Sequence, residues 1–397
     1  MRFNILIALT SLVLCVLMDL YIYKIIRKRL PGRSNITAKI HAVTAILGYG
    51  VIITAIALPR QSGENSVLVA DMWLIFIFLT MLVSKLAFCV TDWIAQIPRI
   101  VGFRRPGWLS AIGIAVAAGI FISMWWGALI NRNRISVTET TAESSRWPQS
   151  FDGYRIVQIS DLHTGTWGTD TTFLSPLVGR INSLDPDLIV FTGDIVNRRS
   201  DEFEPMVSTF ARMHARDGVY AILGNHDYGD YSYWPSDKEH MADRENLRHL
   251  YKLTGHRLLL NETEYLTRGN DSIALIGVEN IGEPPFATYG DLSKAYTNIG
   301  DSLPKILLTH NPAHWTADIQ NNPKANIDLT LSGHTHAMQI QIAGHTPSSF
   351  RYDTPWGVYT DTLGHTLNVN RGAGTVGMPM RLGATPEITV ITLHKAH

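Results

Sequence analysis

Five short segments of the sequence concentrate residue types that bind metal ions or carry protons. Carboxylate, imidazole and amide groups without a thiolate suit divalent ions such as Mn²⁺, Fe²⁺ or Zn²⁺. A single Asp is often a helix cap and a single His often a core or surface residue, so only the combination predicts a metal site. The segments are Asp161-Leu162-His163, Gly193-Asp194, Gly224-Asn225-His226-Asp227, His310-Asn311-Pro312 and Gly333-His334-Thr335-His336.

These segments follow predicted strands. β-rich apolar runs predict strands over Arg155–Ser160, Leu188–Thr192, Val219–Leu223, Ser272–Val278, Lys305–Thr309, Ile327–Leu331 and Glu387–Leu393. Amphipathic patterns predict helices over Thr172–Leu184 and Glu204–His214. The alternation of strands and helices predicts an α/β fold. Because ligands of α/β sheets bind at the carboxyl ends of strands, we expect the five segments to converge on one site.

In this order the five segments resemble the motifs of the calcineurin-like metallophosphoesterase superfamily, over about residues 150–397. The resemblance is closer to the bacterial membrane-associated branch, which includes transmembrane metallophosphoesterases and UDP-2,3-diacylglucosamine hydrolase-like enzymes. It implies a four-layer α/β architecture, a β-sandwich flanked by helices. One departure is that Ala337 and Met338 precede Gln339 where that branch often has glycines, which affects the expected pocket wall and no expected ligand.

The resemblance also implies roles for particular residues. It implies two divalent ions held by two groups of three ligands and a bridging aspartate: Asp161, His163 and His336 for one ion, Asn225, His310 and His334 for the other, and Asp194 between them. His226 is expected to protonate the leaving group, and Asp227 to orient His226. Paired ions offset charge on phosphoryl oxygens during in-line attack. A positioned general acid adds about 10²–10⁴-fold.

Other residues near these motifs are open to two interpretations. Arg371 either contacts a substrate phosphate or pairs with a carboxylate, and His314 is expected on a helix surface. Four aromatic residues after the third segment form either a rim for a lipid or base, or a surface loop packed on the domain: Tyr228, Tyr231, Tyr233 and Trp234.

The N-terminal third contains four apolar segments, each long enough for the roughly 20 residues that a bilayer requires. They are Asn4–Tyr23, Ile40–Leu58, Val67–Val90 and Leu109–Ile130. The first leads into basic residues rather than a small-residue cleavage site, which argues against a signal peptide. The sequence therefore predicts a four-helix transmembrane anchor over residues 1–130, a polar linker over 131–150 and a catalytic domain over 151–397.

The short loops between these segments predict an orientation. The first and third loops are basic, with Lys24, Arg27, Lys28, Arg29, Arg33 and Lys39 in one and Arg99, Arg104 and Arg105 in the other. The second loop carries only Arg60, offset by Glu64. The positive-inside rule then places the catalytic domain outside, in a multi-pass protein of the cell (inner) membrane, although Arg2, Arg132 and Arg134 weigh slightly against this. Three scattered charges, Asp19, Asp71 and Lys85, favour anchoring over transport.

The amino-acid composition limits the classes of partner and of cysteine site that we expect. Lys+Arg and Asp+Glu are both 34, so the basic excess of a nucleic-acid-binding protein is missing and no such partner is expected. The two cysteines, Cys15 and Cys89, lie in apolar segments, which excludes a disulfide framework or a zinc–thiolate site in the soluble part. The oligomeric state is left open.

The leading functional hypothesis is a membrane-anchored phosphoesterase that hydrolyses a phosphate ester or pyrophosphate of a lipid-linked or envelope substrate. The alternatives are a non-catalytic metal-binding receptor or scaffold, and UDP-2,3-diacylglucosamine pyrophosphohydrolase activity in lipid A synthesis. The lipid A precursor is made on the cytoplasmic side, so that activity and an outward-facing domain exclude each other.

Overall fold

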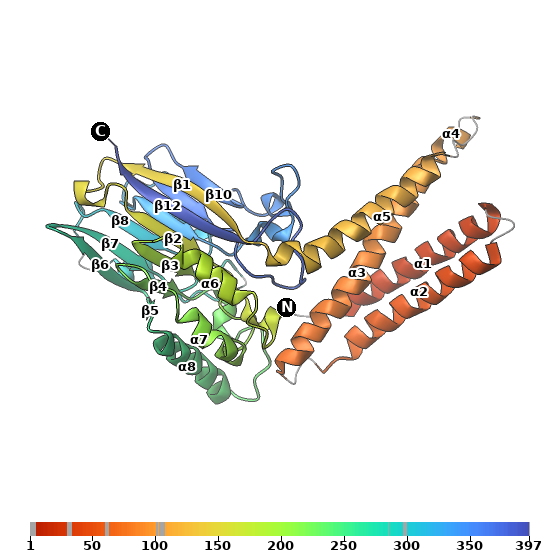
Figure 1. Cartoon of the computed structure of the whole chain (residues 1–397), viewed down its shortest axis with the longest axis horizontal. Helices are drawn as coiled ribbons and strands as arrows, with labels where there is room; N and C mark the ends of the chain where they lie inside the picture. The colour runs from red at the N-terminus through yellow and green to blue at the C-terminus, as the bar shows by residue number, and fades with distance from the viewer. Residues whose placement is uncertain are drawn as a thin grey trace. The chain divides into compact units, whose positions relative to one another are not determined.

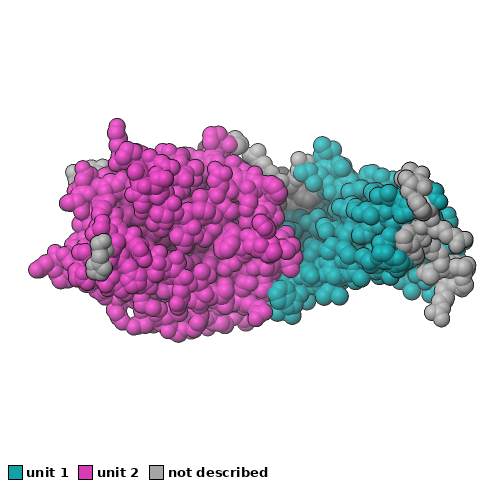
Figure 2. Space-filling view, turned by 90° about the horizontal axis from the view of Figure 1, so that it is seen from above, with its two compact units in different colours: residues 1–130, 377–380 teal, residues 131–376, 381–397 magenta. Residues whose placement is uncertain are grey.

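The computed structural model describes residues 5–29, 34–59, 63–100, 102, 108–284, 286–296 and 300–396. Several residues used in the sequence analysis lie outside these ranges, namely Arg2, Asn4, Arg33, Arg60, Arg104 and Arg105. The chain divides into two compact units, unit 1 with residues 1–130 and 377–380 and unit 2 with residues 131–376 and 381–397 (Figure 2).

Unit 1 contains the four expected helices. They are α1 (Ile5–Arg29), α2 (Ser34–Ala57), α3 (Asn65–Ile94) and α5 (Trp108–Leu129), with a short α4 (Ile97–Ile100) between the last two. Each long helix has 22 to 30 residues and is apolar enough to cross a membrane. Within the unit, α1 packs on α2 and α3 packs on α5 (Figure 1).

Two of the three charges that the sequence analysis called scattered, Asp19 and Lys85, lie together in the structure. Asp19 on α1 is buried and lies 2.8 Å from the Lys85 ammonium on α3. The Tyr49 hydroxyl on α2 donates to the same carboxylate at 2.7 Å, and His41 lies 3.4 Å from its other oxygen. Helices that are apolar around their circumference give no sequence signal of which charges will pair, whereas packing brings these charges together and offsets their cost in lipid.

Unit 2 is built on two six-stranded sheets of mixed direction. In order across sheet A the strands are β1 (Ser136–Ser144), β12 (Glu387–Lys395), β2 (Arg155–Ile159), β3 (Leu188–Thr192), β4 (Val219–Ile222) and β5 (Arg257–Leu258). In order across sheet B they are β10 (Gly357–Thr360), β11 (Thr366–Val369), β9 (Leu329–Ser332), β8 (Lys305–Leu308), β7 (Asp271–Gly277) and β6 (Glu262–Arg268). Strands β2 to β5 run parallel, as do β7, β8, β9 and β11.

The strands are buried on both faces, which gives the unit four layers. In β3 the side chains of Leu188 and Val190 pack against sheet B, while Ile189 and Phe191 pack against helices, because successive side chains point to opposite faces. Helices α6 (Leu174–Asn182), α7 (Val207–Phe210) and α8 (Asp237–Thr254) cover sheet A (Figure 1). The outer face of sheet B is covered by α9 (Leu292–Ala295) and the turn Trp315–Ile319. The predicted four-layer α/β class is confirmed.

All seven predicted strands are present with similar bounds, but β5, β6, β10 and β11 were not predicted, and three further segments differ from expectation. Part of the predicted linker 131–150 forms β1, whose polar residues suit the edge of sheet A, where it pairs with β12. The helix expected over Glu204–His214 is α-helical only in α7. Helix α8 was not predicted, because its buried side chains lie only in its second half, at Leu247, Leu250, Tyr251 and Thr254.

Candidate metal centre

The structure brings all seven expected metal ligands together where strands of the two sheets end. Sheet A supplies Asp161 and His163 after β2, Asp194 after β3 and Asn225 after β4, and sheet B supplies His310 after β8 and His334 and His336 after β9. Two groups of three have ligand atoms all within 4.8 Å of one another: Asp161, His163 and His336, and Asp194, His310 and His334. Asn225 joins the second group, its Oδ1 lying 3.1 Å from His310 Nε2.

One carboxylate oxygen connects the two groups. Asp194 Oδ2 lies 3.2 Å from His310 Nε2 and 3.5 Å from His163 Nε2, so it contacts one histidine of each group. In the first group His163 Nε2 lies 3.0 Å from His336 Nε2, which is itself 3.2 Å from Asp161 Oδ1. This is the arrangement in which a carboxylate can bridge two cations.

The hydrogen bonds around the ligands leave the right atoms for cations. The Nδ1 atoms of His163 and His310 donate to the carbonyls of Val196 and Thr192, at 3.1 and 2.7 Å. In the neutral rings Nε2 is therefore an acceptor, and in both it faces the Asp194 Oδ2 acceptor, at 3.5 and 3.2 Å. The Asn225 side chain is oriented in the same way, because its Nδ2 donates to the Tyr231 hydroxyl and its Oδ1 faces His310 Nε2. Acceptors turned toward one another at about 3 Å fit a metal cation between them.

The pKa shifts of the candidate ligands also favour a metal cation at the site. Burial opposes ionisation of Asp194, yet the His310 and His226 imidazoles hold its pKa well below the usual range. Although burial opposes charge on His310, the Asp194 and Asp161 carboxylates raise its pKa to about 9. Burial and the neighbouring His310 lower the pKa of His334 to about 3. The buried carboxylates thus attract positive charge, which a divalent ion supplies better than a proton.

The backbone at the site is strained. Left-handed conformations in non-glycine residues cost of order 1–3 kcal/mol each and cluster at functional sites. Five of the seven candidate ligands adopt them: Asp161 (φ 53°), His163 (φ 48°), Asp194 (φ 61°), His334 (φ 72°) and His336 (φ 51°). Such repeated strain is retained only where the side-chain positions matter more than local stability.

The adjacent glycines allow the loops to approach each other. A Cβ on Gly193, whose φ is 93°, would lie 2.6 Å from the Gly224 nitrogen and 2.8 Å from His310 Nδ1. A Cβ on Gly224 would lie 2.2 Å from Asp194 Oδ1. Any side chain at either position would therefore displace a candidate ligand.

The contacts of Asp227 differ from the expected one to His226, whereas the position of His226 agrees with its expected role. The His226 Nδ1 donates to the Asn197 carbonyl at 2.6 Å, and the ring packs edge-on against His163 with centroids 4.8 Å apart. The Asp227 carboxylate accepts four backbone N–H groups, from Asp194, Ile195, Val196 and Gly224, at 2.8 to 3.1 Å. In this geometry Asp227 holds the Asp194 loop, and the group that orients His226 is the Asn197 carbonyl.

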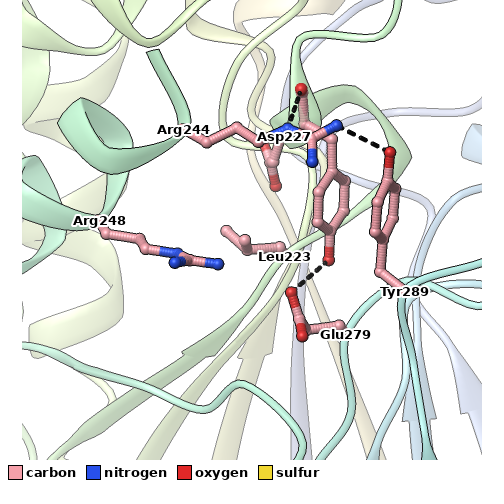
Figure 3. A pocket seen from close by; sticks show the side chains of 7 residues that line it. Leu223, Asp227, Arg244, Arg248, Glu279 and Tyr289 are labelled. Atoms are coloured by element: carbon pink, nitrogen blue, oxygen red, sulfur yellow. Dashed lines mark hydrogen bonds between the residues drawn. The ribbon is translucent and has the colours of Figure 1, made fainter. Parts of the chain in front are cut away.

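Behind the same loop lies a cavity of about 200 Å³ (Figure 3). Arg244 donates to the Tyr228 carbonyl and the Tyr289 hydroxyl there, at 2.9 and 2.8 Å. The rings of Tyr228 and Tyr289 stack with centroids 3.8 Å apart. The lining residues are Leu223, Asp227, Tyr228, Arg244, Arg248, Glu279 and Tyr289. Tyr228 therefore packs inside the domain and supports the loop from behind.

The remaining open positions are resolved by their contacts. Arg371 pairs with Glu387 at 3.2 Å, the second of its two interpretations. His314 is buried rather than on a helix surface, with Nδ1 2.9 Å from the Thr309 hydroxyl. Of the other aromatic residues, Tyr231 accepts a hydrogen bond from Asn225 Nδ2 at 2.9 Å and so reaches the site. Tyr233 is exposed, and Trp234 Nε1 donates to the Gly229 carbonyl at 2.8 Å.

Two residues at the site were missed by sequence reasoning. Arg381 is fully buried, and its Nη2 lies 3.1 Å from Nδ1 of His336. The Tyr352 hydroxyl lies 3.0 Å from Nε2 of His334. Both come from loops without a recognisable motif, so no sequence signal marked them.

Replacing Tyr352 by Phe is expected to weaken metal binding at the second group about 10–100-fold, the usual cost of removing an outer hydrogen bond to a ligand. The ring stays, but His334 loses the partner that directs Nδ1 toward His310. Metal content after dialysis against buffered Mn²⁺ measures this. Tyr359→Phe is the control, because that hydroxyl donates to the Trp356 carbonyl, away from the candidate ligands. Equal metal retention in the two variants would contradict the assigned role.

Comparison with known proteins agrees with this geometry. Residues 154–338 match the calcineurin-like phosphoesterase family, and residues 1–132 match a probable calcineurin-like phosphoesterase transmembrane domain. Over 294 residues the chain is 33% identical to the Bacillus subtilis metallophosphoesterase YkuE, covering 70% of this chain and 93% of that protein. The chain belongs to the calcineurin-like phosphoesterase family. It is a multi-pass membrane protein that hydrolyses phosphate esters.

Two further relatives carry membrane or lipid terms in their names. A Bos taurus transmembrane protein with metallophosphoesterase domain is 30% identical over 66% of this chain and 57% of its own length. The UDP-2,3-diacylglucosamine pyrophosphatase LpxG of Chlamydia trachomatis is 29% identical over 64% of this chain and 81% of its own length. Divalent metal binding is a property of the family to which these proteins belong.

Proposed function

We propose that this phosphoesterase uses two divalent ions to hydrolyse a phosphate ester or pyrophosphate of a lipid-linked or envelope substrate. The observation that carries the proposal is the position of Asp194 Oδ2, within 3.5 Å of one histidine from each group. Asp161, His163 and His336 would hold one ion, Asn225, His310 and His334 would hold the other, and Asp194 would serve both groups.

The protein's own residues supply orientation and a proton. When bound, the paired ions activate water and offset charge on the phosphoryl oxygens. The Asn197 carbonyl holds Nδ1–H of His226, which leaves Nε2 to carry the proton that the leaving group takes. Asp227 fixes the Asp194 loop through its four backbone contacts, so the bridging carboxylate stays in place.

The direct test is hydrolysis of bis-p-nitrophenyl phosphate and p-nitrophenyl phosphate by the detergent-solubilised full chain. We expect chelation to abolish release of p-nitrophenol and one of Mn²⁺, Fe²⁺ or Zn²⁺ to restore it. The ratio of the two rates separates a diesterase from a monoesterase. A folded, metal-loaded sample that hydrolyses neither these esters nor any lipid phosphoester would favour the non-catalytic receptor or scaffold instead.

We also propose that the catalytic unit faces away from the cytoplasm, on the basis of the basic first and third loops. An outward-facing domain suits phospholipids, lipid pyrophosphates and other envelope phosphoesters. Protease digestion of unit 2 in intact spheroplasts tests this. If unit 2 is protected and the purified protein cleaves UDP-2,3-diacylglucosamine, then the orientation is wrong and the activity in the name of the LpxG relative applies.

A further inference from the structure

The segment that follows His336 exposes large apolar side chains beside the metal centre. Met338, Ile342 and Phe350 are 45%, 65% and 96% exposed. Single exposed apolar residues are normal on a protein surface. Here three lie within one short segment, the rim loop (residues 337–352), whose Tyr352 contacts the candidate ligand His334.

The rim loop is held in place by hydrogen bonds. Gln341 donates its backbone N–H to Leu382 at 2.8 Å, and Leu382 donates back to Gln339 at 2.8 Å. The Thr346 hydroxyl donates to the Ala337 carbonyl. The loop thus presents its apolar side chains outward from a fixed backbone, at the cost of exposing them to water.

A second loop adds another exposed aromatic ring. Phe286 is 58% exposed, three residues after Glu283, which forms an ion pair of 2.9 Å with Arg351 of the rim loop. The same loop contacts the site, since Asn311 Nδ2 donates to the Ile281 carbonyl at 3.3 Å. The two loops therefore form a linked apolar rim.

The occupant that fits this rim is a lipid bilayer. Asn131, which follows α5 by two residues, donates to the Arg381 carbonyl at 2.9 Å, and Arg381 contacts His336 at 3.1 Å. Two side chains of unit 2 thus connect its first residue, next to the fourth membrane span, to the metal centre. From Leu329 to Tyr352 the sequence has no carboxylate and one arginine, so nothing acidic in this stretch repels anionic headgroups.

We infer that Met338, Ile342, Phe350 and Phe286 insert into the interfacial region of the bilayer and hold the metal centre at the level of the headgroups. The reactive phosphoryl group then belongs to a lipid that remains in the membrane. The bilayer contact stands independently of turnover, and its consequence for the substrate rests on the proposed function.

The contact can be measured on the full chain in nanodiscs of phosphatidylethanolamine and phosphatidylglycerol. Cysteine is introduced at Phe350 and labelled with an environment-sensitive fluorophore. The native Cys15 and Cys89 are buried in unit 1, and an unmutated sample gives their blank. Met241→Cys on α8 is the matched control, because Met241 is 53% exposed and far in sequence from the rim.

We expect the label at position 350, and not that at 241, to be quenched by nitroxide-bearing lipids and protected from iodide. Equal iodide quenching at both positions without lipid quenching would overturn the inference. A label at 350 that is protected from iodide but indifferent to nitroxide lipids would also overturn it, in favour of a second copy of the chain or another protein.

A second measurement connects the contact to catalysis. We expect Phe350→Asp to lower the ratio of turnover of a vesicle-embedded phosphodiester to turnover of bis-p-nitrophenyl phosphate about 10-fold, and Met241→Asp to leave the ratio unchanged. An unchanged ratio in Phe350→Asp would contradict presentation of the substrate by the membrane. Failure of the unmutated protein on every phosphoester would instead refute the proposed function, while the quenching result still decides the bilayer contact.

Discussion

Asp194→Asn is expected to lower kcat by about 10³-fold or more with any divalent ion, because it removes a preorganised charge from the centre of the site. The Oδ2 atom of Asp194 contacts both His163 and His310. An asparagine is neutral, and because its one oxygen takes the Oδ1 position that accepts the His226 N–H, an amide NH₂ that cannot bind a cation stands at the Oδ2 position. Steady-state kinetics after chelation and reloading with each metal measures the loss.

The fold is expected to survive this change. The Asp194 Oδ1 accepts the His226 backbone N–H at 2.8 Å, and an asparagine oxygen can do the same. Circular dichroism and the midpoint of thermal unfolding should therefore be close to those of the unmutated protein without metal. Metal content should fall from two ions toward one. Retained turnover in a variant with one ion would contradict the two-metal mechanism.

Strand β3 provides a matched control at its other end. Asp187 precedes β3, is also buried, and pairs with Arg216 and Arg268 at 3.0 and 2.7 Å. Removing the charge of Asp187 weakens both ion pairs, although Arg216 keeps Asp185 as a second partner, and this costs stability rather than chemistry. Asp187→Asn is therefore expected to lower the unfolding midpoint while kcat stays near that of the unmutated protein. Asp194→Asn should therefore lower kcat and leave the unfolding midpoint nearly unchanged, whereas Asp187→Asn should lower the midpoint and leave kcat nearly unchanged.

The sequence was sufficient to predict which residues meet at the site, because the candidate ligands directly follow parallel strands. Asp161, Asp194 and His310 come within two residues of the ends of buried strands, and the strand ends of each sheet lie along one edge. Short apolar runs and the residues right after them are local features, so a pattern can identify them. Their distances, by contrast, depend on how the two sheets pack.

The sequence failed where function depends on tertiary contacts. Arg381 and Tyr352 lie in irregular loops and reach the ligands only through the folding of distant segments. Asp227 also makes contacts other than the one to His226 that the resemblance implied. In the turn that follows β4 its carboxylate points to the backbone of the Asp194 loop, whereas the neighbouring His226 ring points to the Asn197 carbonyl.

His226→Gln is expected to lower turnover of esters with alkoxide leaving groups by about 10²–10⁴-fold, the usual contribution of a general acid. For p-nitrophenyl esters we expect a loss under about 10-fold, because p-nitrophenolate leaves readily without a proton. The glutamine amide can still donate to the Asn197 carbonyl but cannot carry a transferable proton. Rates for a series of leaving groups of different pKa measure this, and an equal loss across the series would contradict general-acid catalysis.

The pH dependence gives an independent measure of the same role. Burial lowers the pKa of His226 below its ordinary value of about 6.5, an effect that the Asp194 carboxylate partly opposes. The protonated acid is present below that pKa and is lost as the pH rises through it. For alkyl esters kcat/KM should therefore fall as the pH rises through the pKa of His226. This descending limb of the pH profile should be missing in His226→Gln. Asp227→Asn should act differently, because a loosened Asp194 loop slows alkyl and aryl esters alike and leaves the limb in place.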